Sequence, residues 1–372
     1  MNEELREKTG RIVKMLEREG LDAVLLNARH NFAWLTGGGT SGVDTSRENG
    51  VATLMVTRDG GRYVIANNIE TPRMFADEVS EADFDPLSFA WQAEKADSGT
   101  IAKTALSALR PEAVIASDID IGGSLPAIDC KIAACRHQLT TDEAVRFRRL
   151  GSDAGAAMRR AIDSFEPGDS ETAIAEKIRH ELASAGAVSV VTLAAADDRI
   201  KRFRHPVPTA NRWERTLLAV TCAQRGGLIV SLSRVISLGP PDEDLVRRTQ
   251  AAADVFAALR HATRPGTTGR ELYETAERAY AATGFAGEIG LHHQGGAAGY
   301  KTRDWVAHPK SDEVVKLGQA FAWNPSITGT KVEETCIVTA NGTDVVTASP
   351  DLPQVRTVID GAEYLSPGIL SL

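Results

Sequence analysis

Apolar positions in the first third of the chain change between helical spacing and short continuous runs. Residues 4–20 carry apolar side chains at helical spacing, and the run at 21–26 is typical of a strand. Two further apolar segments, 51–57 and 62–66, flank Arg58-Asp-Gly-Gly61, which predicts a hairpin. A helix at 101–109 and a strand at 113–116 follow. This pattern predicts a first unit of the α/β class.

The helical pattern becomes longer and repeats after Thr141. One helix is predicted over 141–165, Pro167-Gly168 breaks it, and a second helix ends at Gly186. The same order returns with Pro265-Gly266 and Gly284, each 98 residues after its counterpart. Strand-like segments follow each pair of helices. We interpret this as an internal duplication that builds an α+β domain, although Pro-Gly after a helix is also common punctuation.

Composition and charge exclude several classes of function. The chain has 372 residues, a net charge of −8 and 25% charged residues, so it lacks the basic excess of a general nucleic-acid binder. No apolar run approaches the length of a membrane span, and the charged start Met1-Asn-Glu-Glu does not resemble a signal peptide. None of the four cysteines forms a Cys-x-x-Cys pair. We therefore expect a cytoplasmic protein that binds neither nucleic acid nor membrane.

Several ordered segments carry a resemblance to a known family. Residues 25–37 end in Trp-Leu-Thr-Gly, and 139–149 begin a long helix with Thr-Thr-Asp-Glu. His205-Pro-Val-Pro-Thr209 precedes the apolar hairpin, and Leu317–Pro325 and Lys331–Thr339 follow the second pair of helices. Together these segments resemble the pita-bread family of methionine aminopeptidase, proline dipeptidase, aminopeptidase P and creatinase. The resemblance covers nearly the whole chain.

This resemblance implies a two-domain architecture. Residues 1–137 are expected to form a small α/β creatinase-like domain. Residues 138–372 are expected to form the α+β pita-bread domain, with duplicated helix–helix–strand units on a curved antiparallel sheet. Homodimers are usual in the family, so a homodimer is expected here.

The hairpin where the family holds its metals lacks acids, since residues 215–241 contain no Asp or Glu. The family's two aspartates fall at Val220, to within one or two residues, and at Ser231. Its histidine falls at Gly296, and its two glutamates at Asn324 and Glu333. With four of these five ligands replaced, a two-metal centre has too few hard oxygen donors. We expect no catalytic metal and no other cofactor.

A mononuclear centre of His292, His293 and Glu333 is the remaining metal alternative. Neighbouring residues on a strand point to opposite faces, so we expect that the two histidines do not face one ion.

The catalytic candidates are His205, His292, His293 and Glu333. Creatinase hydrolyses a C–N bond without metal and uses a histidine at the position of His205, and imidazole titrates near neutrality. The glutamates that assist it there fall at Ser233 and Asn324, so the resemblance does not carry its whole mechanism. The string His292-His-Gln-Gly-Gly-Ala-Ala-Gly-Tyr300 suggests a roomier pocket beside an imidazole. If buried without metal, Glu333 needs a cationic partner or a raised pKa, which would suit a general acid.

Other polar and aromatic residues are candidates for contact with substrate. Arg303 can grip a carboxylate in bidentate fashion. The full set of candidates is Arg303, Lys301, Gln294, Tyr300, Trp323, Asn324, Ser231, Arg29 and His30. Structural alternatives exist for several: a solvated basic loop for Arg303, core packing for Trp323, and an exposed loop for Arg29 and His30. His205 and the glycine string can equally serve backbone bonding and tight packing.

Three hypotheses follow from these residues. The favoured one is a metal-independent enzyme that acts on a small polar, carboxylate-bearing molecule by His-centred acid/base chemistry, most simply hydrolysis of a C–N bond, with elimination or isomerisation as variants. The second is a non-catalytic pseudopeptidase that binds a peptide, metabolite or protein. The third is a conventional Xaa-Pro metallopeptidase.

Overall fold

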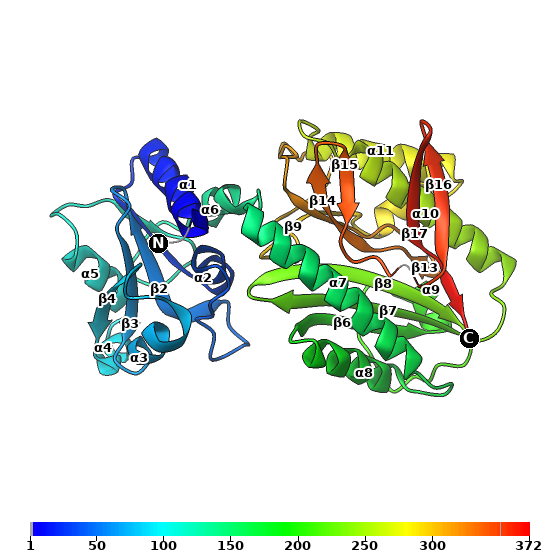
Figure 1. Ribbon diagram of the computed structural model, residues 1–372, viewed down its shortest axis with the longest axis horizontal. Coiled ribbons are helices and arrows are strands. Elements are labelled where there is room, and N and C mark those ends of the chain that lie inside the picture. The colour runs from blue at the N-terminus through cyan, green and yellow to red at the C-terminus, as the bar shows by residue number, and fades with distance from the viewer. Residues whose placement is uncertain (1–2, 350) are drawn as a thin grey trace. The chain divides into compact units, whose positions relative to one another are not determined.

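The computed structural model describes residues 3–349 and 351–372, and the chain divides into two compact units (Figure 1). One unit contains Met1–Thr141 with Gly226–Leu228, and the other contains Asp142–Arg225 with Ile229–Leu372. Among the described residues, no helix is long and apolar enough to cross a membrane.

The first unit is built on a five-stranded sheet in the order β4-β3-β2-β1-β5. The expected hairpin is present, since β2 (Asn49–Thr57) pairs with β3 (Arg62–Asn67) in antiparallel fashion. All six residues of β1 (Ala23–Ala28) are buried, and β5 (Ile115–Ser117) runs parallel to it. The other elements are α1 (Glu3–Glu19), α2 (Arg29–Thr36), α3 (Thr71–Arg73), a π-helical turn at Met74–Glu78, β4 (Asp85–Phe89), α4 (Trp91–Ala96), α5 (Thr100–Ser107) and α6 (Asp129–Arg136).

The second unit contains two helix pairs and two larger sheets. Its first half holds α7 (Thr141–Asp163), α8 (Glu171–Ser184), β6 (Val188–Ala196), α9 (Asp198–Arg202), β7 (Thr216–Arg225) and β8 (Leu228–Ser237). Its second half holds α10 (Glu243–Ala262), α11 (Gly269–Ala282), the 3-10 helix η2 (Ala286–Leu291), β9 (Gly295–Ala298), β10 (Trp305–Val306), β11 (Ala320–Trp323), β12 (Ser326–Ile327), β13 (Thr330–Lys331), β14 (Glu334–Thr339) and β15 (Gly342–Val345). The strands β16 (Gln354–Ile359), β17 (Ala362–Pro367) and β18 (Ile369–Ser371) follow.

The two halves repeat the same local interactions 98 residues apart, as the sequence pattern predicts. Ser170 caps the start of α8 by accepting a hydrogen bond from Ala173, and Thr268 caps α11 in the same way through Glu271. The two helices end before Gly186 and Gly284, whose φ angles of 70° and 82° favour glycine. The duplication is therefore present in the backbone as well as in the sequence.

The strands form a sheet in the order β18-β8-β7-β6 and another in the order β10-β9-β11-β14-β15. In Figure 1, α7 and α8 lie along β6–β8, and α10 and α11 lie along the strands of the second half. Direct backbone bonds join the halves: the Ile229 N–H donates to Gly299, and the Ser233 N–H donates to the carbonyl of Glu333. This seam brings β8 of the first half beside the segment that contains Glu333.

Candidate active site

The predicted catalytic residues and the predicted substrate contact Arg303 come from four loop or strand-end segments of the second unit. His205 lies between α9 and β7, and His292 and His293 lie between η2 and β9. Arg303 lies between β9 and β10, and Glu333 lies just before β14. The fold brings these segments together although as many as 128 positions separate His205 from Glu333 in the sequence.

Glu333 is buried and held by two cations. Its Oε1 atom lies 3.2 Å from Nη2 of Arg303, and its Oε2 atom lies 2.8 Å from Nζ of Lys331. The three side chains are 3%, 11% and 4% exposed, in the order Glu333, Arg303, Lys331. Sequence reasoning missed Lys331; its place two residues before Glu333 was the available signal. The three groups together carry one excess positive charge.

Glu333 is ionised in this setting. Burial alone would raise the pKa of Glu333, but the attraction of Lys331 and Arg303, with their hydrogen bonds, outweighs burial and lowers it. A carboxylate with a lowered pKa does not donate a proton near neutral pH. Glu333 has the expected cationic partners, and its lowered pKa does not favour the role of general acid, which stays a prediction.

The three histidines meet at one point. Nε2 of His205 lies 3.1 Å from Nε2 of His292, and a ring nitrogen from each of His205, His292 and His293 lies within 4.8 Å of the others. The rings of His292 and His293 are stacked, with centroids 4.5 Å apart. The expectation that these neighbours face apart is wrong, because both precede β9 and lie outside the regular strand.

Partial desolvation and nearby cations favour the neutral form of the three histidines. Desolvation by burial lowers the pKa of His205, and the nearby positive charge of Lys331 adds to the effect. The same causes, burial first, lower the pKa of His292 to about 2, whereas burial and Arg303 lower that of His293 to about 4. His292 is buried, while His205 and His293 are exposed. A neutral, exposed imidazole can accept a proton from a bound molecule or from water.

Hydrogen bonds fix the ring of His292. Its Nδ1 lies 3.4 Å from Oγ of Ser326, whose backbone N–H donates to the hydroxyl of Tyr280 over 3.1 Å. Tyr280 in turn donates to Oε1 of Gln294 over 2.5 Å, and Gln294 donates to the carbonyl of His292. The amide oxygen and nitrogen of Gln294 both bond to other residues of the protein, so we assign Gln294 the role of positioning His292.

The loop that carries His205 is anchored by Glu171, which sequence reasoning missed. This fully buried carboxylate accepts hydrogen bonds from the backbone N–H of Thr209 at 2.9 Å and from its hydroxyl at 2.8 Å. It also accepts one from Nε of Arg199 at 2.8 Å. Glu171 is the first residue of α8, where an acid is common, so its sequence position gave no signal of this second role.

The five positions that correspond to metal ligands contain little that can bind a hard cation. Ser231 contacts Cys222, with Sγ 3.2 Å from Oγ, and Cys222 lies two residues from Val220, within the range in which the first aspartate is expected. Val220 instead packs in an apolar cluster with Leu193 and Leu218. Burial raises the pKa of Cys222, which keeps the thiol protonated. Ser231 also lies 3.4 Å from Nη1 of Arg303.

The glycines before Tyr300 pack tightly against backbone. A Cβ atom at Gly296 would lie 2.1 Å from the carbonyl oxygen of Trp305 on β10, and one at Gly295 would lie 2.1 Å from that of Ala322 on β11. A histidine could not occupy position 296 without moving β10. The expectation of a roomier pocket at these two glycines is wrong, because neighbouring strands fill the space.

Comparisons with known proteins agree with this architecture. The model of metallopeptidase family M24 matches residues 146–340. This chain belongs to metallopeptidase family M24. The Xaa-Pro dipeptidase of Pyrococcus furiosus is 26% identical over 227 residues, which is 58% of this chain and 64% of that protein. The chain thus spans less than two thirds of this curated relative.

Solved structures of prolidases share the M24 fold over almost the whole chain. The prolidase of Thermococcus sibiricus has a TM-score of 0.79 at 15% identity and covers 100% of both chains. The prolidase of Pyrococcus horikoshii OT3 has a TM-score of 0.77 at 18% identity and covers 92% of this chain and 98% of that one. These matches confirm the predicted pita-bread fold with a smaller domain before it.

The residues present do not fit the two-metal centre that the M24 resemblance implies. The candidate donors are a protonated thiol, a hydroxyl, an amide and one carboxylate, at Cys222, Ser231, Asn324 and Glu333. The carboxylate is already neutralised by Arg303 and Lys331. Two divalent ions would require several oxygen ligands and would be repelled by these cations.

Two of the predicted substrate contacts, Trp323 and Tyr300, have structural roles in this M24 chain. Trp323 is completely buried and donates to Thr263, the residue that follows α10, over 3.1 Å, so it belongs to the core, as the structural alternative predicts. The hydroxyl of Tyr300 donates to Glu143 on α7 over 2.7 Å and is buried there. Lys301 is partly buried and contacts other groups of the protein.

Arg29 and His30 lie in the first turn of α2, within the first unit, instead of in an exposed loop. Arg29 donates to the carbonyls of Thr45 and Arg47. His30 is 10% exposed, with a ring nitrogen 3.4 Å from Asp129. The predicted contact of these residues with substrate stays a prediction.

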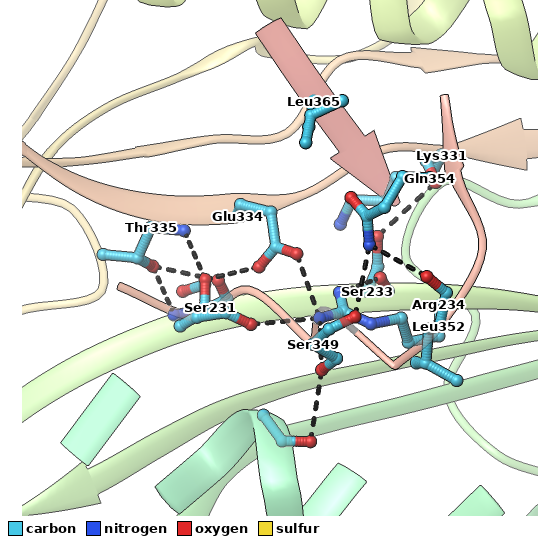
Figure 2. A network of polar contacts seen from close by, with 12 residues as sticks. Ser231, Ser233, Arg234, Lys331, Glu334, Thr335, Ser349, Leu352, Gln354 and Leu365 are labelled. Carbon is cyan, nitrogen blue, oxygen red and sulfur yellow. Dashed lines mark hydrogen bonds and ion pairs between the residues drawn. The ribbon is translucent and has the colours of Figure 1, made fainter. Parts of the chain in front are cut away.

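A buried network of polar side chains lies beside the site and links the segments at the seam (Figure 2). Arg234 lies 2.9 Å from Oε1 of Glu334 and donates to Ser349 over 3.0 Å, and Ser349 donates to Gly155 on α7. Burial raises the pKa of Glu334 to about 7 against the opposing effect of Arg234. The network thus connects β8, β14 and α7.

Proposed function

We propose that this chain is a metal-independent M24 enzyme that acts on a small polar, carboxylate-bearing substrate by histidine-centred acid/base chemistry. The observation that carries the proposal is the double ion pair of Glu333 with Arg303 and Lys331, because Glu333 is the one carboxylate that the resemblance aligns with a metal ligand. The family supplies the fold; the histidines supply the groups that can move protons.

His205 is the proposed proton acceptor. It is exposed, its lowered pKa leaves it neutral near pH 7, and the contact with His292 orients its ring. In hydrolysis of a C–N bond, His205 would take a proton from water as the oxygen attacks the carbonyl carbon. It would then return the proton to the leaving nitrogen as the C–N bond breaks.

Arg303 is the proposed contact for the substrate carboxylate. Its Nε is buried and has no hydrogen-bond acceptor among the described residues, so the guanidinium retains a donor beyond its bonds to Glu333 and Ser231. Oδ1 of the buried Asn324 likewise has no donor in the described part of the chain. The excess positive charge and these two unpaired polar atoms favour binding of an anionic ligand that also carries a hydrogen-bond donor.

A binding protein without chemistry is the second candidate. It is favoured by the ionised state of Glu333, which leaves the site without a carboxylic acid to assist His205. Formation of product separates the two candidates, because both predict that carboxylate-bearing molecules bind. A homodimer, as the resemblance implies, is part of the proposal and is tested by light scattering.

The experiment is a product assay on small amides, ureido acids, guanidino acids and Xaa-Pro dipeptides, run with a strong chelator present. Turnover in chelator that falls in His205→Ala but persists in His180→Ala, an exposed histidine on α8, is expected. Binding without product would favour the second candidate. Turnover that chelator abolishes and added metal restores would contradict the proposal.

A further inference from the structure

We propose that His205, His292 and His293 form a binding site for one divalent transition-metal ion, separate from the five positions of the family's two-metal centre. The ligands would be three imidazole nitrogens and a fourth group from solvent. The ions of matching chemistry are Zn²⁺, Co²⁺ and Ni²⁺, because imidazole suits these ions better than it suits Mg²⁺ or Ca²⁺.

The distances between the ring nitrogens match a shared ion. At Zn–N distances of about 2.0–2.1 Å, two ligands of a tetrahedral ion lie about 3.3 Å apart. The Nε2 atoms of His205 and His292 lie 3.1 Å apart, and the nitrogen of His293 completes a group within 4.8 Å. The exposed His293 ring would have to move closer to the other two for all three nitrogens to bind one ion. Nitrogen atoms at this spacing either share a proton or share an ion.

The surroundings of His292 resemble the outer shell of a metal site. Ligating histidines usually bond their second ring nitrogen to a fixed polar group, which sets the orientation of the ring. Nδ1 of His292 lies 3.4 Å from Oγ of Ser326, and Ser326 is itself held by Tyr280 and by Arg204 at 3.3 Å. His205 and His293 are exposed, so an ion has access from solvent and keeps an open coordination position.

Nearby positive charges should make this site bind a cation more weakly than three histidines without such neighbours would. Lys331 and Arg303 lie close enough to His205 and His293 to lower their pKa values, and the same charges repel a cation. Glu333 compensates for only one of them. Replacement of Lys331 by glutamine removes one repelling charge and leaves Arg303 to pair with Glu333. Lys331→Gln should therefore bind the ion more tightly than the natural chain.

A bound ion would also control the proposed reaction. The lone pair of His205 that accepts a proton is the one that a metal would take, so the ion would inhibit turnover. This inhibition rests on the proposed function, whereas binding of the ion does not. Failure of binding and failure of catalysis are thus separate results.

The experiment titrates the full-length protein, stripped of metal by chelator, with CoCl₂ and then displaces the cobalt with ZnCl₂. The readouts are the visible absorption of tetrahedral cobalt and the stoichiometry from calorimetry. One ion per chain is expected. His293→Ala, which alters an exposed ring, should weaken binding about 100-fold or more, and Ser326→Ala about tenfold. His180→Ala is the matched control and should leave the affinity unchanged.

Two results would overturn the proposal. One is the absence of a tetrahedral cobalt spectrum in a chain that is folded by circular dichroism. The other is an affinity that is equal in the natural chain and in His293→Ala. Lys331→Gln should fold and bind the ion more tightly, whereas His293→Ala should bind it more weakly. A gain in one variant and a loss in the other cannot both result from unfolding.

Discussion

Glu333 and Glu334 are neighbours in the sequence, yet they belong to two regions with different tasks. Glu334 lies in a buried framework where Arg234, Thr347 and Ser349 use their polar groups on one another. Glu333 lies in a region where two cations compete for one carboxylate and two histidines are exposed. The framework uses most of its polar groups internally, with Nε of Arg234 as an exception, whereas the site exposes two imidazoles to solvent.

This difference separates what holds the M24 fold from what the site does. A closed polar network contributes to stability only while every member is present, because a buried charge without its partner is costly. An exposed imidazole such as that of His205 adds little to stability and remains accessible to a ligand. We therefore expect substitutions in the framework to change folding and substitutions in the site to change chemistry.

The largest effect is expected from Arg234→Met in the framework. It leaves Glu334 buried without its cation and should lower the free energy of unfolding by about 3–5 kcal/mol, measured by urea denaturation. The double variant Arg234→Met/Glu334→Leu should recover much of the loss. The exposed pair Arg148–Asp344 is the control, and Arg148→Met should cost less than about 1 kcal/mol. A loss below that value in Arg234→Met would remove the distinction between the two regions.

His205→Ala should have the next largest effect, but on chemistry instead of folding. Loss of a general base lowers turnover by about 100-fold or more. Because His205 is exposed, the free energy of unfolding should change by no more than about 0.5 kcal/mol. Product assays and denaturation on the same sample check both. A loss of stability large enough to account for the loss of activity would show that His205 has a structural role instead of a catalytic one.

Glu171→Gln should have an intermediate effect that depends on pH. The substitution weakens the anchor of the His205 loop and should cost about 2 kcal/mol near neutral pH. Burial would raise the pKa of Glu171, but the hydrogen bonds from Ala196 and Thr209 outweigh it and lower the pKa below 4.5. The stabilisation is therefore present above pH 4.5 and is lost as pH falls through the folded-state pKa. Denaturation curves should converge in acid, and a constant difference would contradict this role.

The smallest effect is expected from Arg303→Lys. The charge is kept, so the ion pair with Glu333 can persist, but the planar fork and its open Nε are lost. Affinity for a carboxylate-bearing ligand should fall by about tenfold, or about 1.4 kcal/mol. Calorimetric titration with such a ligand and with its uncharged amide tests this. Equal binding of acid and amide by the natural chain would exclude Arg303 as the carboxylate contact.

The sequence predicted the parts of this molecule that depend on local pattern. The 98-residue repeat of Pro-Gly breaks and glycine stops is reproduced in the caps at Ser170 and Thr268. The hairpin at Arg58–Gly61 also follows from local turn chemistry. These features need only neighbours in the chain.

The site depends on contacts between distant segments, and there the sequence was a weaker guide. Nothing near Trp323 distinguished a core indole from a ligand contact, because the choice depends on the distant Thr263, just after α10. The backbone just before β9 turns His292 and His293 to one side, which the alternation rule for strands does not describe. Lys331 was missed because its importance depends on Arg303 and Glu333 meeting it in space.

The most direct test of the central claim is the number and location of metal ions in the purified, folded chain. We would titrate the natural chain, His293→Ala and Glu333→Gln with Co²⁺ and measure stoichiometry by calorimetry. We predict one ion per chain, lost in His293→Ala and retained in Glu333→Gln. Two ions per chain that survive His293→Ala and disappear in Glu333→Gln would restore the family's metal centre and contradict the account.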